Sequence, residues 1–175
     1  MILKSVLVED ERLAEENFPE VEKRFVREKA YPNFDWVTFA NPSPVNLLDK
    51  PVPECRVALV TTAGAHLRTD PPFNLRSAIG DYTYREIPND ASLDDLRLSH
   101  IGYDIKRVST DKNCVLPLDR LGELAAEGII GDLAPRHFSF MGYVAETDPL
   151  INGTAPEVAE KLKADHVDLV LLAPA

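Results

Sequence analysis

The sequence predicts an α/β protein whose mostly parallel sheet is flanked by helices. Two short apolar runs, residues 57–60 and 169–172, have the composition of strands that are covered on both faces. Strand-like and helix-like segments alternate between them, as in parallel sheets. We expect residues 1–53 to form an N-terminal helical segment with a proline-rich connector, and residues 54–175 to form the α/β domain.

The individual elements follow from local patterns. Residues 9–30 are charge-rich with helical spacing, and the prolines within 31–53 indicate an extended connector. Strands are expected at 57–60, 81–88, 135–144 and 166–175. The helical signals are a capped turn at Ser92, a helix over 118–128 that ends at Gly128, and a helix that begins in a capping box at Thr154.

Composition excludes several classes of function. The net charge of −10 argues against nucleic acid or an anionic membrane as a partner, because both bind clustered Lys and Arg. The two cysteines, Cys55 and Cys114, have no metal or redox spacing, and a buried, inert Cys114 is favoured over a nucleophile. No segment resembles a signal peptide or a membrane helix, so we expect a soluble, cytoplasmic protein.

The turn after the first strand is the leading candidate site. Thr61, Thr62 and His66 follow residues 57–60, and ligands of open α/β sheets bind beyond the carboxyl ends of strands. We expect the strands ending near Val60, Leu98 and Leu172 to be parallel neighbours. This arrangement brings His100 to the same edge, and we extend the expectation to His137. The alternative is a well-capped turn with a surface histidine.

The histidines leave two chemical readings open. His66, His100 and His137 either act separately, as structural or substrate-contacting groups, or converge on a metal ion. Separate roles are favoured, because Gly102 makes a metal-binding helical pair of His100 with Asp104 improbable. The spacing of glycines is neither that of a Rossmann nor of a Walker phosphate loop, and no nucleophile elbow is present.

Six blocks of sequence together carry a resemblance to a known family. They are residues 56–67 (RVALVTTAGAHL), 80–88 (GDYTYREIP), 99–104 (SHIGYD), 117–121 (PLDRL), 135–143 (PRHFSFMGY) and 167–174 (VDLVLLAP). In this order they resemble the selenoprotein B family of glycine, sarcosine, betaine and D-proline reductases, nearest to its short, D-proline-reductase-like branch. The resemblance covers roughly residues 45–175 and implies a flavodoxin- or Rossmann-like domain.

The resemblance implies an oxidoreductase subunit that cleaves a C–N bond reductively. In this family a selenocysteine or cysteine attacks an amino-acid-derived substrate held by a pyruvoyl-bearing partner subunit. The blocks then suggest substrate-binding residues, which are Thr61, Thr62, His66, His100, Tyr103, Asp104, His137 and Ser139. No metal is expected.

The catalytic residue implied by the resemblance has no counterpart in these 175 residues. Family members carry the Cys or Sec motif directly after the strand that matches 167–174, and we expect it just after Ala175, encoded through a UGA codon. A non-catalytic ligand-binding or partner subunit with the same fold is the alternative. Because an apolar strand ends the sequence, we also expect a homodimer or a tightly bound partner subunit at this edge.

Overall fold

The computed structural model describes residues 24–30, 32 and 46–175. The chain divides into two compact units, Met1–Val45 and Asn46–Ala175. The described part of the first unit contains η2 (Val26–Ala30), a short π-helical turn. Most of the helix expected at 9–30 and much of the connector expected at 31–53 lie outside the described residues. The domain boundary expected after residue 53 stays a prediction.

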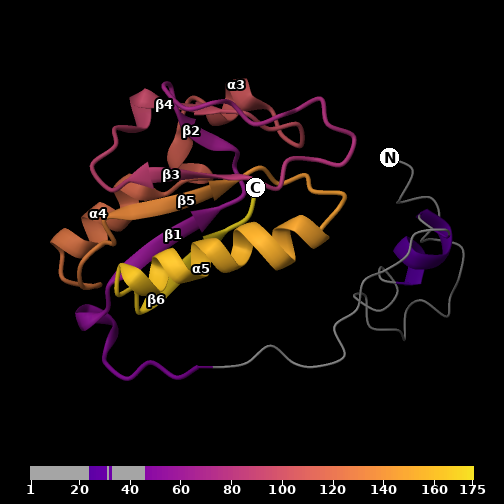
Figure 1. The fold of residues 1–175 in the computed structure, drawn as a ribbon. Helices are drawn as coiled ribbons and strands as arrows, with labels where there is room; N and C mark the ends of the chain where they lie inside the picture. The colour runs from indigo at the N-terminus through magenta and orange to yellow at the C-terminus, as the bar shows by residue number, and fades with distance from the viewer. Residues whose placement is uncertain (1–23, 31, 33–45) are drawn as a thin grey trace, which may run out of the picture. The chain divides into compact units, whose positions relative to one another are not determined.

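The second unit is built on a four-stranded sheet with the order β3–β5–β1–β6 (Figure 1). The strands β1 (Val57–Thr61), β5 (Arg136–Phe140) and β6 (Leu169–Ala173) run parallel. Strand β3 (Tyr84–Pro88) is antiparallel to β5 at one edge of the sheet. This mostly parallel sheet with flanking helices confirms the predicted α/β class.

A second, two-stranded sheet corrects one expectation of the sequence analysis. Strand β4 (Leu96–Leu98) does not join the parallel sheet but pairs antiparallel with β2 (Ala65–Leu67). The cause is the tight turn after β1, where Gly64 adopts a positive φ of 66° and returns the chain directly into β2. The Ser99 N–H then donates to the Gly64 carbonyl at 2.8 Å, which continues the pairing past β4.

Two helices of nine and ten residues, α4 (Leu118–Ala126) and α5 (Ala155–Ala164), flank the main sheet. As predicted, Gly128 follows α4 with a positive φ of 70°. The predicted capping box at Thr154 is wrong, because the Thr154 hydroxyl donates to the Tyr82 carbonyl at 2.7 Å instead. The shorter helices are α3 (Ile105–Val108), η3 (Val52–Glu54), η4 (Leu93–Asp95), η5 (Lys112–Cys114) and η6 (Leu150–Thr154).

The alternation of side chains along β1 and β5 divides the apolar core between the two faces of the sheet. Val57 and Leu59 belong to a cluster with residues of β2, β4 and α4. On the other face, Phe138 and Phe140 contact Val158 of α5, and Val60 packs there as well. Figure 1 shows α5 along one face of the sheet and the β2–β4 pair beyond it on the other side. Successive residues of a strand therefore serve different cores.

An ionic cluster ties the amino end of β5 to its neighbours. Arg136 Nε donates to Asp165 Oδ2 at 2.7 Å, and its Nη1 donates to Glu86 Oε2 of β3 at 3.0 Å. Lys161 of α5 reaches the other oxygen of Glu86 at 2.6 Å. One guanidinium thus joins β5, β3 and the end of α5 through charge-assisted hydrogen bonds.

Replacing Arg136 should destabilise the fold much more than replacing an arginine in a simple surface pair. We expect Arg136→Met to lower the free energy of unfolding by about 1–3 kcal/mol, since Asp165 and Glu86 lose a shared partner. The matched control is Arg120→Met, which breaks only the exposed pair with Glu123 and should cost about 0–0.5 kcal/mol. Urea unfolding followed by circular dichroism measures both; equal losses would contradict the assignment.

Candidate functional site

The candidate site lies where β1, β5 and β6 end at their carboxyl edge. The Thr62 N–H, just after β1, donates to the Ala173 carbonyl at the end of β6 at 3.2 Å. The Gly64 N–H donates to the Phe140 carbonyl at the end of β5 at 2.7 Å. These two bonds fix the turn after β1 between the ends of its two neighbours.

The two threonines of this turn have different surroundings. Thr61 is fully buried, and its hydroxyl donates to the Val115 carbonyl at 2.7 Å and accepts the Ala63 N–H at 3.1 Å. Thr62 is half-buried, and its Oγ1 accepts the Ala175 N–H at 2.9 Å. Thr61 therefore holds the turn, whereas Thr62 lies at the edge itself.

His100 presents a buried hydrogen-bond donor at this edge. Its Nδ1 accepts the Gly102 N–H at 2.8 Å, which leaves the proton of the neutral ring on Nε2. Nε2 is buried and has no hydrogen-bond partner among the described residues. Burial lowers the pKa of His100 below its ordinary value, so the ring is neutral at pH 7. An unpartnered polar atom in the interior is costly, and such atoms often have a functional role.

Gly142 marks where the His100 ring meets the end of the sheet. A Cβ atom at this glycine would lie 2.6 Å from His100 Nε2, 3.0 Å from the Ala175 oxygen and 3.3 Å from the Thr62 oxygen. The donor of His100 and the backbone of Thr62 thus approach the same point, just past the end of β5. Only a residue without a side chain fits between them.

Tyr103 and Asp104 support this arrangement in different ways. The Tyr103 ring stacks on His100 with centroids 4.4 Å apart, and its hydroxyl donates to the Ala63 carbonyl at 2.5 Å. Burial raises the pKa of Tyr103 to about 12, so it stays a donor. Asp104 is exposed and caps α3 by accepting the N–H of Lys106 at 3.0 Å, so its carboxylate serves the helix.

His66 is oriented as the partner of a serine. Its Nδ1 lies 2.8 Å from the Leu67 carbonyl, which can only accept, so Nδ1 carries the proton. Its Nε2 lies 3.0 Å from the Ser99 hydroxyl and is the acceptor of that bond. The ring is buried and meets Phe73 edge-on at 6.2 Å. His66 thus orients Ser99, the residue that precedes His100.

His137 lies inside the sheet, and Ser139 is buried near the carboxyl end of β5. Both are fully buried on β5, where His137 is opposite Ile87 and Ser139 is opposite Thr61. His137 Nδ1 accepts the Leu59 N–H at 3.0 Å, and its Nε2 lies 3.2 Å from Asn89 Oδ1. Ser139 Oγ accepts the Ala65 N–H at 2.8 Å. All of these bonds connect strands or loops of the fold.

The structure therefore brings Thr62, His100 and Tyr103 together and places His66 next to them through Ser99. Thr61, Asp104, His137 and Ser139 make bonds within the fold at separate places. Sequence reasoning did not single out Ser99 or Gly142. For Gly142, the signal was a glycine two residues past the end of an aromatic strand, where a glycine allows close approach of the backbone.

Neither the histidines nor the cysteines form a metal or redox cluster in the described part of the chain. His66, His100 and His137 each have their own partners, and no group of three or more His, Cys, Asp or Glu is arranged to hold a metal. Cys55 is buried just before β1, whereas Cys114 is exposed. The expectation of a buried Cys114 was wrong, because the short η5 turn that it ends lies at the surface.

Comparison with known proteins identifies related chains. A family model described as glycine/sarcosine/betaine reductase selenoprotein B matches residues 20–175. The D-proline reductase subunit gamma of Acetoanaerobium sticklandii is 45% identical over 123 residues, which are 70% of this chain and 50% of that protein. No solved structure matches.

Among the described residues, no helix has the length and apolar character needed to cross a membrane.

More distant relatives carry related names. The sarcosine reductase complex component B subunit beta of Peptoclostridium acidaminophilum is 32% identical, over 86% of this chain and 33% of that protein. The glycine reductase complex component B subunit gamma of Symbiobacterium thermophilum is 30% identical, over 85% of this chain and 33% of that protein. This chain thus spans between a third and a half of the length of these relatives.

The buried His137 should make stability fall at acidic pH. Burial lowers its pKa to about 4, while the unfolded chain has the ordinary value of about 6.5. Between these values the unfolded state binds one more proton, so the free energy of unfolding should decrease as pH falls from about 6.5 to 4, by roughly 3 kcal/mol in total.

Urea unfolding at a series of pH values tests this linkage. His137→Gln, which keeps one donor and one acceptor, should remove most of this acid-dependent loss. The control His166→Asn changes an exposed histidine and should leave the loss in place. An NMR titration that gives His137 an ordinary pKa in the folded protein would contradict the prediction.

Proposed function

The chain belongs to the glycine/sarcosine/betaine reductase selenoprotein B family, and from this premise we propose that it forms the substrate-facing edge of an amino-acid reductase subunit. The relatives are named as subunits of D-proline, glycine and sarcosine reductases. The proposed reaction is the reductive cleavage of a C–N bond in an amino acid. The proposed location is the cytoplasm.

The observation that carries the proposal is the unpartnered Nε2–H of His100 at the carboxyl edge. Reductive cleavage consumes two electrons and two protons and leaves a new C–H and a new N–H bond. The substrate carries a carboxylate, and its nitrogen gains electron density as the C–N bond breaks. A neutral imidazole donor, already desolvated and fixed by Gly102 and Tyr103, suits the binding of such an oxygen or the stabilisation of developing charge.

We propose D-proline-type substrates rather than glycine or sarcosine. The support is the identity of 45% to the D-proline reductase subunit, against 30% and 32% to the glycine and sarcosine reductase subunits. In this proposal Thr62 and His100 contact the substrate directly, and His66 positions Ser99 beside them. Thr61, Tyr103, Asp104, His137 and Ser139 hold the site through the fold.

The redox step needs a thiol or selenol, and neither cysteine of the chain is assigned to it. Cys55 is buried before the first strand, at the amino end of the sheet, and Cys114 lies on an exposed turn. We propose that a selenocysteine or cysteine centre works with this edge in the whole subunit. The residues described here bind the substrate and hold a proton at His100 Nε2.

A ligand-binding subunit without reductase activity is the second candidate function. Its support is the set of contacts that hold the His100 ring, the Gly102 N–H and the stacked Tyr103, which orient a donor for binding and include no thiol. The two candidates make different predictions for the whole reductase assembly. A binding subunit retains D-proline without turnover, whereas a reductase subunit converts it when supplied with a dithiol as electron donor.

Removing the donor of His100 should weaken the site without unfolding it. We expect His100→Phe, which keeps a ring to stack on Tyr103, to lower kcat/KM for D-proline in the assembled reductase by about 10- to 100-fold. His100→Gln supplies an N–H donor again and should recover part of the loss. Steady-state kinetics with thermal unfolding of each variant measures the effect.

The control for this series is His166→Asn, an exposed histidine just before β6 at the opposite end of that strand. It should leave kcat/KM unchanged. A folded His100→Phe variant with normal turnover and normal D-proline affinity would contradict the assigned role. If the wild-type assembly binds D-proline without turnover and His100→Phe weakens that binding, the result supports the binding-subunit candidate instead.

We propose further that the free edge of β6 is the contact with a second copy of the chain. Among the described residues, β6 is the last strand of the sheet, and Leu172 and Leu171 are 70% and 41% exposed. An apolar strand with an unpaired edge favours pairing with another chain.

The oligomeric state tests this contact. We expect the chain to behave as a dimer in size-exclusion chromatography with light scattering at micromolar concentration, and Leu172→Lys to shift it toward monomer. Ile129→Lys, at another exposed apolar residue, serves as the control and should leave the dimer intact. A monodisperse wild-type monomer would contradict the proposal.

A further inference from the structure

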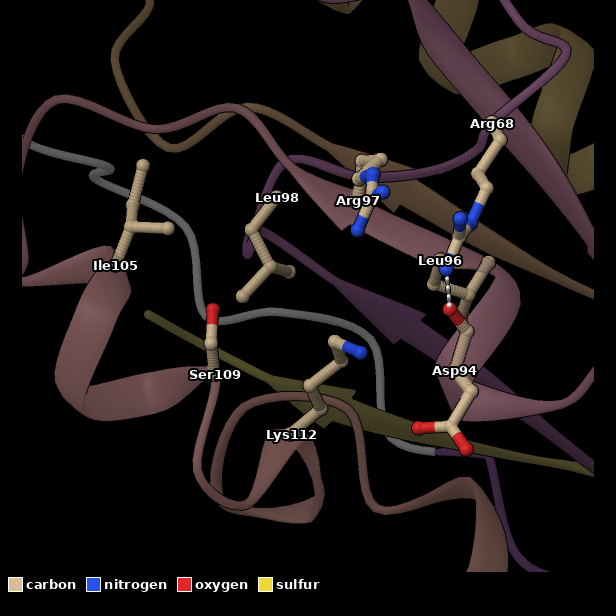
Figure 2. A pocket seen from close by; sticks show the side chains of 8 residues that line it. All are labelled: Arg68, Asp94, Leu96, Arg97, Leu98, Ile105, Ser109 and Lys112. Carbon is tan, nitrogen blue, oxygen red and sulfur yellow. Dashed lines mark hydrogen bonds between the residues drawn. The ribbon is translucent and has the colours of Figure 1, made fainter.

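A cavity lies between β4, α3 and the η5 turn (Figure 2). It has a volume of about 600 Å³, within the range of small-molecule sites. Its lining consists of Arg68, Asp94, Leu96, Arg97, Leu98, Ile105, Ser109 and Lys112. Three of these residues are cationic and one is acidic, in a chain whose net charge is −10. The lining therefore carries more positive than negative side chains.

Two of the cations are held in place by backbone carbonyls. Arg68 Nη2 donates to the Asp94 carbonyl at 2.8 Å, the bond drawn in Figure 2. Lys112 Nζ donates to the Leu93 carbonyl at 2.6 Å. Both carbonyls belong to η4, so this one turn positions a guanidinium and an ammonium. A neutral carbonyl orients a cation but leaves its charge uncompensated.

No carboxylate neutralises these charges within the described part of the chain. Arg68, Arg97 and Lys112 form no ion pair there, and Arg97 is exposed with no hydrogen bond from its guanidinium. The one acidic residue of the lining, Asp94, does not pair with Arg68 through its carboxylate. In Figure 2 the Asp94 carbonyl faces Arg68, and the Asp94 carboxylate lies on the other side of the residue. Arg97 thus has free donors in a fork that suits a carboxylate or phosphate.

The remaining lining residues give the cavity an apolar part. Leu96 is buried, Leu98 and Ile105 are half-buried, and Ser109 adds a hydroxyl at the end of α3. An inorganic anion alone would leave the exposed parts of Leu98 and Ile105 in contact with water. We infer that this cavity binds a small organic anion, a carboxylate or a phosphate ester with a short aliphatic body, at a site separate from the substrate edge.

Binding of simple probes to the 175-residue chain tests the inference. Isothermal titration calorimetry with butyl phosphate and with butyrate should show saturable binding that weakens as salt is added, because ion pairs with exposed cations are screened. Butanol, which lacks the charge, and inorganic phosphate, which lacks the aliphatic body, should each bind more weakly. The two anions separate phosphate esters from carboxylates as the preferred class.

Arg97→Gln should weaken binding of the better probe by about tenfold, since one charge-assisted contact is lost. The matched control Arg76→Gln removes a charge from another exposed arginine, outside the cavity lining, and should leave affinity unchanged. Equal weakening in both variants, or no saturable binding up to roughly 10 mM, would overturn the inference. Binding of inorganic phosphate as tight as that of butyl phosphate would overturn the assignment to an organic anion.

Discussion

Strand β1 carries apolar side chains on both faces, and each face has to be covered if the strand is to leave water. The helix α5 covers one face, while α4 and the β2–β4 pair contribute to the cluster on the other. The fully buried His137 sits on the second face and accepts the Leu59 N–H of β1. A strand in this position cannot shift by one residue, because every side chain would then move to the wrong core. Because the register is fixed, the positions of the residues at the carboxyl edge are fixed as well.

This fixed edge surrounds the Nε2 atom of His100, which has no hydrogen-bond partner among the described residues. The ends of β1, β5 and β6 are joined by backbone hydrogen bonds at Thr62 and Gly64, and a Cβ at Gly142 would lie 2.6 Å from His100 Nε2. An unpartnered buried N–H costs free energy, and flexible surroundings would normally supply an acceptor. The stacked Tyr103 and the Gly102 N–H hold the ring so that this donor keeps its direction.

The β2–β4 pair connects the two places where ligands are proposed to bind. His66 of β2 lies opposite Arg97 of β4 in the register. His66 turns to Ser99 next to the substrate edge, while Arg97 lines the cationic cavity. The two sites therefore share one short antiparallel ribbon, which places them in neighbouring parts of the fold without a shared lining residue.

The α/β class, the strands around residues 57–60 and 169–172, and the end of α4 at Gly128 could be predicted from sequence, because they depend on local periodicity and turn chemistry. The grouping of Thr62 with His66 and His100 was expected from strand ends alone, although the reason given for His100 was wrong, since β4 pairs with β2.

Tertiary structure decided which polar residue faces the carboxyl edge and which one makes all its hydrogen bonds within the fold. His137 and His100 were both expected at the carboxyl edge. Both ring nitrogens of His137 have partners, in Leu59 and Asn89, while Nε2 of His100 has none among the described residues. Sequence pattern determines which residues are placed in an element. Whether a polar atom finds a partner depends on groups far away in the chain, and only packing brings these together.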